Sequence, residues 1–156
     1  MTDQKQIKKL LEPLFYLFNK TLLPANEASF LNFQQQALKR NIPETVVEQL
    51  TDFYQVTNGV PSLDCFTFHG CGDKNLYEWW NERKEIWLGH RDDDILRWKN
   101  NQFCLGDMST VSYSDEYSFS TLSELLEKSF EKWYLGLWFR FIDSHNEIDL
   151  WRAKTR

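Results

Sequence analysis

The chain has 156 residues, enough for one domain around a single core and too few for two. Hydrophobic residues make up 42% and aromatic residues 16%, with seven Trp, and this composition excludes intrinsic disorder. The net charge of −5 is concentrated in residues 61–131, where fourteen Asp and Glu accompany seven Lys and Arg. An acidic segment of this kind repels phosphate backbones and attracts basic proteins, so nucleic acid is not expected as a ligand.

The expected compartment is the cytoplasm, without a membrane partner. The longest apolar stretches are too short to cross a bilayer, and Pro13 and Arg140 interrupt them. The N-terminal residues mix charges into an apolar pattern and lead to no small-residue cleavage site. Cys65, Cys71 and Cys104 match neither a zinc spacing nor a disulfide framework, so we expect reduced cysteines.

Two amphipathic helices are predicted at the start of the chain. Apolar side chains recur at helical spacing over residues 3–22, and Pro13 either kinks this helix or starts a fresh turn. Asn26 is a suitable N-cap for a second helix, which runs until Asn41.

A third helix has the clearest start and stop signals. Pro43 lies in its first turn, an apolar stripe begins at Val46, and Asn58-Gly59 ends it. After this helix the pattern changes to apolar and polar alternation over residues 64–70, which predicts a strand.

A meander of short strands is predicted in the middle of the chain. Asn100-Asn101 indicates a β-hairpin turn, because asparagine adopts positive φ readily. Residues 76–87 fit either a helical turn or the approach to a strand. Later strands continue the meander, with Asp115-Glu116 at its tip.

The last predicted helix follows the meander. Ser120 or Thr121, with Glu124, has the spacing of a capping box. The aromatic tail over residues 132–156 fits a continuing helix or a pair of strands. Antiparallel strands between helices predict an α+β fold: residues 1–156 as a single domain, with an antiparallel β-sheet and helices packed around it.

The segment 87–98, WLGHRDDDILRW, is the first candidate for chemistry. His90, Asp92, Asp93 and Asp94 suggest a metal or catalytic cluster, but neighbouring residues of a strand point to opposite faces. The segment also lacks the pattern of a calcium-binding loop. Two other interpretations stay open: three solvated carboxylates at a strand entrance, or an exposed surface that docks a basic partner.

No motif in the sequence predicts catalysis, a metal site or a cofactor. Cys104 lies near Asp107 but has no neighbouring histidine to activate it, and the three histidines are isolated. Neither a G-x-S-x-G turn nor a glycine-rich phosphate loop occurs. We therefore expect a protein without enzymatic activity, and a metal-dependent hydrolase using His90 with Asp92–Asp94 is the lesser alternative.

Tryptophans near the acidic residues are candidate interface anchors. Indole rings stack on bases and sugars, but they also fill cores and anchor protein interfaces. The surrounding acidity favours a protein over an anionic ligand. The candidate partner-binding residues are Asp92, Asp93, Asp94, Asp115, Glu116, Trp80 and Trp87.

Two segments resemble the SUKH superfamily and together cover about a third of the chain. Residues 42–59, IPETVVEQLTDFYQVTNG, are similar to its helix of pattern LP-x(n)-FL-x(n)-NG. Residues 103–134, FCLGDMSTVSYSDEYSFSTLSELLEKSFEKWY, are similar to its later half, a strand ending in Gly-Asp, a hairpin and a helix. The resemblance implies that Pro43 marks the start of the helix, that Asn58 and Gly59 mark its end, and that Gly106 forms a turn at the end of a strand.

The resemblance implies a non-catalytic binding domain. SUKH members include bacterial immunity proteins that neutralise toxins, often nucleases, and relatives in eukaryotic cell-wall regulation. Nuclease surfaces are basic because they hold phosphates, and an inhibitor gains rate and specificity from carboxylates around aromatic anchors. The expected partner is therefore a basic toxin domain, and a regulatory adaptor without a toxin is the alternative.

Overall fold

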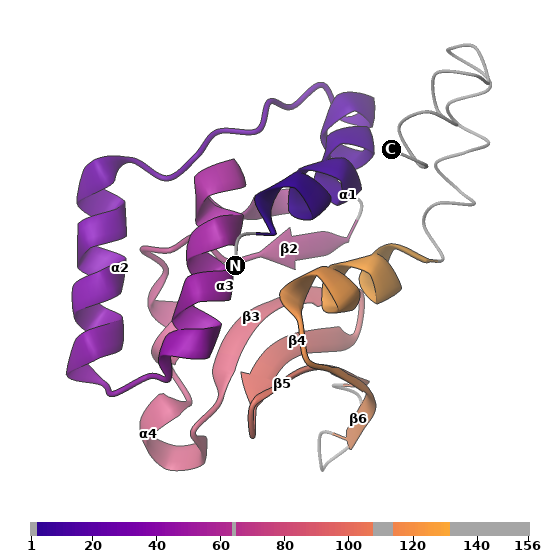
Figure 1. Cartoon of the computed structure of the whole chain (residues 1–156). Helices are drawn as coiled ribbons and strands as arrows, with labels where there is room; N and C mark the ends of the chain where they lie inside the picture. Colours follow the sequence, from indigo (N-terminus) through magenta and orange to yellow (C-terminus); the bar gives the residue numbers. More distant parts are fainter. Residues whose placement is uncertain (1–2, 64, 108–113, 132–156) are drawn as a thin grey trace.

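The structure, a computed structural model, describes residues 3–63, 65–107 and 114–131. It confirms the predicted α+β class, with helices before and after an antiparallel sheet (Figure 1). The helical elements are α1 Gln4–Leu17, α2 Glu27–Lys39, α3 Glu44–Val56, the 3-10 turn η1 Lys74–Tyr77, α4 Trp80–Arg83 and a helix over 122–131. The strands are β1 Val60–Leu63, β2 Phe66–Phe68, β3 Ile86–Arg91, β4 Asp94–Lys99, β5 Gln102–Asp107 and β6 Ser114–Phe119. Across the described ranges, no helix has both the length and the apolar character needed to cross a bilayer.

Local signals determine where the first three helices begin and end. The Asn26 side chain accepts a hydrogen bond from the Ser29 amide at 2.8 Å, the predicted N-cap of α2. Pro43 is the N-cap of α3, one residue before its first turn. Helix α1 continues through Pro13, which is buried inside it, so no new helix starts there.

The six strands form one sheet in the order β1-β2-β3-β4-β5-β6, each antiparallel to its neighbours. Asn100 and Asn101 connect β4 to β5 with φ of 50° and 60°, the positive values that a two-residue turn requires. Residues 76–87, undecided from sequence, end η1, form α4 and enter β3.

Two predictions about the later strands are wrong. Asp115 and Glu116 lie inside β6 and not at a hairpin tip. Gly106 is one residue before the end of β5, where the register with β6 shifts, and does not form a turn beyond the strand. A glycine at such a β-bulge is common because the local backbone bends there.

Helices α1, α2, α3 and the 122–131 helix contribute to one core with the sheet. Phe53 of α3 stacks on Phe68 of β2, with ring centroids 4.0 Å apart. Phe130 meets Phe66 of the same strand edge-on at 4.9 Å. Because Phe66 and Phe68 are two residues apart in a strand, they point to one face. Helix α3 and the last helix therefore cover the same face of the sheet (Figure 1).

The Asn58-Gly59 segment joins α3 to the loop that follows β2. Asn58 Oδ1 accepts a hydrogen bond from the Cys71 amide at 2.9 Å. Gly59 has φ of +85°, and a Cβ there would lie 2.6 Å from the Phe68 carbonyl oxygen. Only glycine satisfies both the backbone angle and the close approach.

Candidate protein-binding surface

The sheet register brings acidic residues from three strands to one end of the sheet. Asp94 at the start of β4 pairs with Asp107 at the end of β5. Asp115 of β6 is in register with Gly106, the neighbour of Asp107. Adjacent strands are about 4.8 Å apart, so these positions are close although they span more than twenty residues of sequence. We call Asp92, Asp93, Asp94, Asp107 and Asp115 the acidic end.

Asp92 and Asp93 form the two-residue turn between β3 and β4, and both are exposed. The backbone of Asp92 has φ of +49° and its amide donates to the Cys65 carbonyl at 2.9 Å. Among the described residues, neither carboxylate has a hydrogen-bond or ion-pair partner. The turn therefore projects two unpaired negative charges from a fixed backbone.

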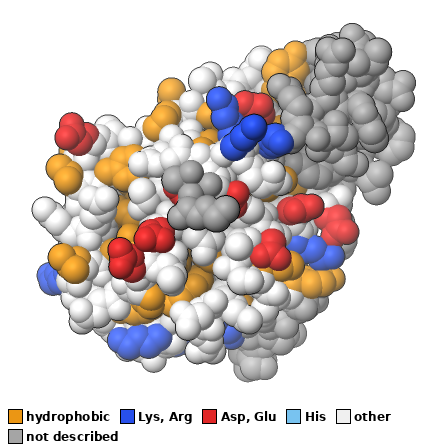
Figure 2. Space-filling model, in the orientation of Figure 1, with side chains coloured by type: hydrophobic (Ala, Val, Ile, Leu, Met, Phe, Trp, Pro, Cys, Tyr) orange, Lys and Arg blue, Asp and Glu red, His pale blue; other side chains and the backbone are white. Residues whose placement is uncertain are grey.

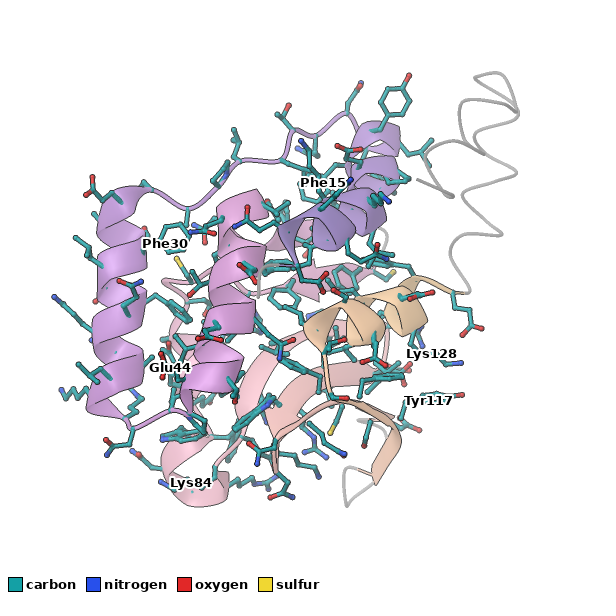
Figure 3. All side chains as sticks on the ribbon, viewed as in Figure 1. Phe15, Phe30, Glu44, Lys84, Tyr117 and Lys128 are labelled. Atoms are coloured by element: carbon teal, nitrogen blue, oxygen red, sulfur yellow. The ribbon has the colours of Figure 1, made fainter. Side chains whose placement is uncertain are left out.

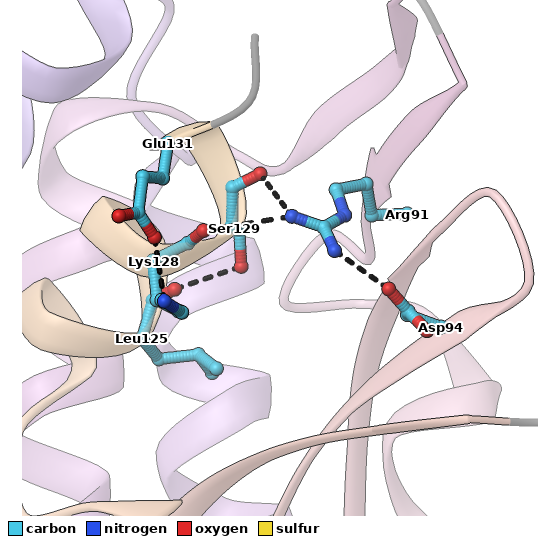
Figure 4. A network of polar contacts seen from close by, with 6 residues as sticks. All are labelled: Arg91, Asp94, Leu125, Lys128, Ser129 and Glu131. Carbon is cyan, nitrogen blue, oxygen red and sulfur yellow. Dashed lines mark hydrogen bonds and ion pairs between the residues drawn. The ribbon is translucent and has the colours of Figure 1, made fainter. Parts of the chain in front are cut away.

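Asp94 is held in place by Arg91. The Arg91 Nη2 atom lies 2.6 Å from Asp94 Oδ2, and its Nη1 atom donates to the carbonyl of Ser129 at 2.8 Å (Figure 4). A second carbonyl, that of Lys128, lies 3.5 Å from Nη1. Arg91 therefore ties the hairpin to the last helix and balances the charge of Asp94, whose carboxylate is less available to a partner than those of the turn.

The last helix adds its own acidic residues beside the hairpin. Glu124, Glu127 and Glu131 are exposed at i, i+3 and i+7 spacing, which places them on one face. Figure 2 shows acidic side chains gathered over this helix. Lys128 partly balances them: its Nζ lies 2.6 Å from Glu131 Oε2, and this contact lowers the pKa of Glu131.

The two predicted anchors do not lie at the acidic end. Trp80 is 5% exposed and packs against Trp98, and its Nε1 donates to the Arg40 carbonyl at 3.0 Å. It therefore offers a partner almost no ring surface. Trp87 is half-buried beside Trp79, with centroids 5.3 Å apart. It lies five residues before Asp92, about 16 Å along β3.

The His90 and aspartate segment does not form a metal cluster. Within the ranges that the structure describes, no three His, Cys, Asp or Glu side chains come together in a way that could hold a metal ion. His90 is exposed on β3, in register with Ile95 and not with an aspartate. The geometry therefore adds no support to a hydrolase that uses these residues.

Sequence reasoning missed Asp107, Glu127 and Glu131. Glu127 and Glu131 had a usable signal, since their helical spacing with Glu124 predicts a shared acidic face. Asp107 had none, because only the β4–β5 register shows that it faces Asp94. Asp115 and Glu116 were predicted contacts, and β6 brings the backbone of Asp115 to the acidic end while Glu116 lies at the register shift.

Comparison with protein-family models finds no match to this chain, and comparisons with curated proteins and with solved structures find no significant match either.

Proposed function

We propose that this protein is a non-catalytic binding module whose acidic end docks onto a basic protein, in the manner of a SUKH-type immunity protein that neutralises a nuclease toxin. One observation supports this most directly: a rigid two-residue turn presents the free carboxylates of Asp92 and Asp93 beside the acidic face of the last helix. A partner that holds phosphates has the complementary positive surface.

The exposed carboxylates and the fixed turn both favour association with a basic protein. Exposed charges raise the rate of encounter with an oppositely charged partner, and salt weakens this effect. The turn is held by the hydrogen bond from the Asp92 amide to the Cys65 carbonyl and by Arg91, so little conformational entropy is lost on binding. Trp87 and Trp79 provide an aromatic surface at the other end of β3 and would serve as an anchor only for a partner that spans the strand.

The experiment compares three proteins: wild type, Asp92→Asn with Asp93→Asn, and Glu44→Gln with Glu48→Gln. Glu44 and Glu48 are exposed on α3, and Glu44 lies on the opposite side of Figure 3 from Lys128. Both double variants lose two negative charges, so the second controls for net charge. Asparagine also tolerates the positive φ of Asp92, which keeps the turn intact.

The tagged proteins are used to capture partners from source cells at low and at raised salt, and association rates are then measured with the captured basic protein. The Asp92/Asp93 variant should associate about 10-fold more slowly at low salt, with a flatter salt dependence, and the α3 variant should match wild type. Equal rates for the two variants, or capture of a partner that salt does not release, would contradict the proposal.

The captured partner and a metal titration of the purified protein distinguish two other functions. An adaptor without a toxin would capture a partner that lacks nuclease or other toxic activity. A metal-dependent hydrolase would release heat on titration with calcium, magnesium, manganese or zinc, and the binding-module proposal expects no such heat.

A further inference from the structure

A cavity of about 350 Å³ lies between α2 and residues 71–78. Its volume is at the lower end of the range for small-molecule sites, which is about 300–1,000 Å³. Helix α2 lies at the left edge of Figure 1, away from the last helix to which the acidic hairpin is tied. The cavity is thus a separate feature from the proposed protein-binding surface.

Arg40 is the most informative residue of the cavity. Its Nη1 atom donates to both the backbone carbonyl and the side-chain oxygen of Gln36, and its guanidinium carbon lies 4.6 Å from the centroid of the Tyr77 ring. The Arg40 carbonyl is also held, by Trp80 Nε1. Among the described residues, none accepts a bond from Nη2 or Nε of Arg40, and no carboxylate forms an ion pair with it. A fixed guanidinium with free donors is suited to bind a carboxylate.

Tyr77 lines the same cavity and places its ring against the Arg40 guanidinium. Its hydroxyl oxygen is buried, with no hydrogen-bond partner among the described residues. A ligand in the cavity would therefore meet the ring of Tyr77 and not its hydroxyl group.

The remaining charges of the cavity are balanced. Lys74 and Arg40 contribute two positive charges, and Asp73 and Glu78 contribute two negative ones. A purely anionic ligand would meet both signs, whereas a small zwitterion satisfies both. The carboxylate of an amino acid would suit Arg40, and its ammonium group would suit Asp73 or Glu78.

We propose that this cavity binds a free amino acid, with Arg40 as the carboxylate-binding residue and Tyr77 as the residue whose ring positions the Arg40 guanidinium. The site would give the protein a small-molecule ligand in addition to a protein partner.

The test measures thermal unfolding of the full chain with each of the twenty common L-amino acids at millimolar concentration, followed by calorimetry with those that stabilise it. At least one amino acid should raise the melting temperature, and its C-terminal amide, which lacks the carboxylate, should not. Arg40→Gln should weaken binding about 10- to 100-fold. Lys39→Gln, an exposed neighbour on the same helix with the same loss of charge, should bind as wild type.

Two further variants separate binding from folding. Tyr77→Leu removes the ring that lies against the Arg40 guanidinium and should weaken binding about 2- to 10-fold, and the melting temperature of the free variant reports whether it is folded. Arg40→Lys keeps the charge but not the planar geometry, so it should bind more weakly than wild type even where Arg40→Gln is poorly folded. The Asp92/Asp93 variant should bind the amino acid normally, which separates this proposal from the proposed function.

Three results would overturn the inference: no amino acid stabilises the wild-type protein, the amides bind as tightly as the acids, or both Arg40 variants bind as wild type does.

Discussion

Arg91 and Asp94 face each other across the first pair of the β3–β4 hairpin, with the guanidinium Nη2 2.6 Å from the carboxylate Oδ2. Asp94 is also in register with Asp107, another carboxylate on the neighbouring strand. Like charges directly opposite in a sheet are destabilising. Arg91 therefore offsets part of the repulsion between Asp94 and Asp107.

We expect the two partners of this pair to differ in their effect on stability. Arg91→Met removes the bonds to Asp94 and Ser129 and leaves Asp94 facing Asp107, so it should cost about 2 kcal/mol. Asp94→Asn removes the ion pair with Arg91 but also removes the repulsion from Asp107, so it should lower the free energy of unfolding by about 1 kcal/mol or less. Urea unfolding of the two variants and their double variant checks this, and equal costs would contradict the compensating role of Arg91.

Gly89 should not tolerate a side chain, because the backbone of β2 lies too close to it. A Cβ at Gly89 would lie 2.0 Å from the Thr67 carbonyl oxygen of β2, whereas one at Gly72 would have no atom within 4 Å. Because Thr67 and Gly89 belong to neighbouring strands, Gly89→Ala must displace backbone and should cost about 2 kcal/mol or more. Gly72→Ala is the matched control and should change stability by less than about 0.5 kcal/mol. Similar melting temperatures for the two variants would rule out the close approach.

Loss of Arg97 alone should destabilise the protein more than loss of both charges of the buried Glu85–Arg97 ion pair. Arg97 is 1% exposed, and its Nη1 lies 2.9 Å from Glu85 Oε1, which also accepts from Trp87 Nε1. Arg97→Met leaves the buried Glu85 carboxylate without its ion-pair partner and should lower the free energy of unfolding by about 3–5 kcal/mol. Adding Glu85→Gln removes the stranded charge and should restore part of that loss. A double variant as unstable as the sum of the single variants would argue against coupling.

Stability should fall on mild acidification because of His69. Burial lowers the pKa of His69, and the Asp73 carboxylate, 3.4 Å from Nδ1, only partly opposes this effect. The folded state then binds fewer protons than the unfolded state, so this contribution is complete above the unfolded pKa of about 6.5 and is lost as pH falls below it.

Denaturant unfolding at pH 7.5 and at pH 5.5, compared between wild type and His69→Gln, isolates this contribution because other groups titrate in both proteins. The variant should lose less stability between the two pH values. Equal losses would mean that His69 has the same pKa in both states.

Local sequence signals were sufficient for several elements. Asn26 before α2, Thr121 with Glu124 before the last helix, and Asn100-Asn101 between β4 and β5 all act as predicted. Each depends on a cap or turn preference that operates within about four residues. The aromatic tail over 132–156, also considered from sequence, lies outside the described residues.

Sequence reasoning failed where the answer depended on contacts between distant segments. Trp80 looks from its acidic surroundings like an exposed anchor, but it packs against Trp98 and Arg40, each far from it in sequence. Asp115 was placed at a tip because its polar neighbours are typical of turns, yet β6 pairs it with Gly106.

The sequence by itself determined the N-caps of α2 and of the last helix, the Asn100-Asn101 turn and the acidic character of the middle of the chain, because these follow from neighbouring residues and from composition. Only the tertiary structure decided which carboxylates share one end of the sheet and which are neutralised, as Asp94 is by Arg91 while Asp92 and Asp93 are not. It also decided that Arg40 and Tyr77 meet at one cavity. The physical reason is that strand register and helix packing join residues tens of positions apart, and no local preference specifies that pairing.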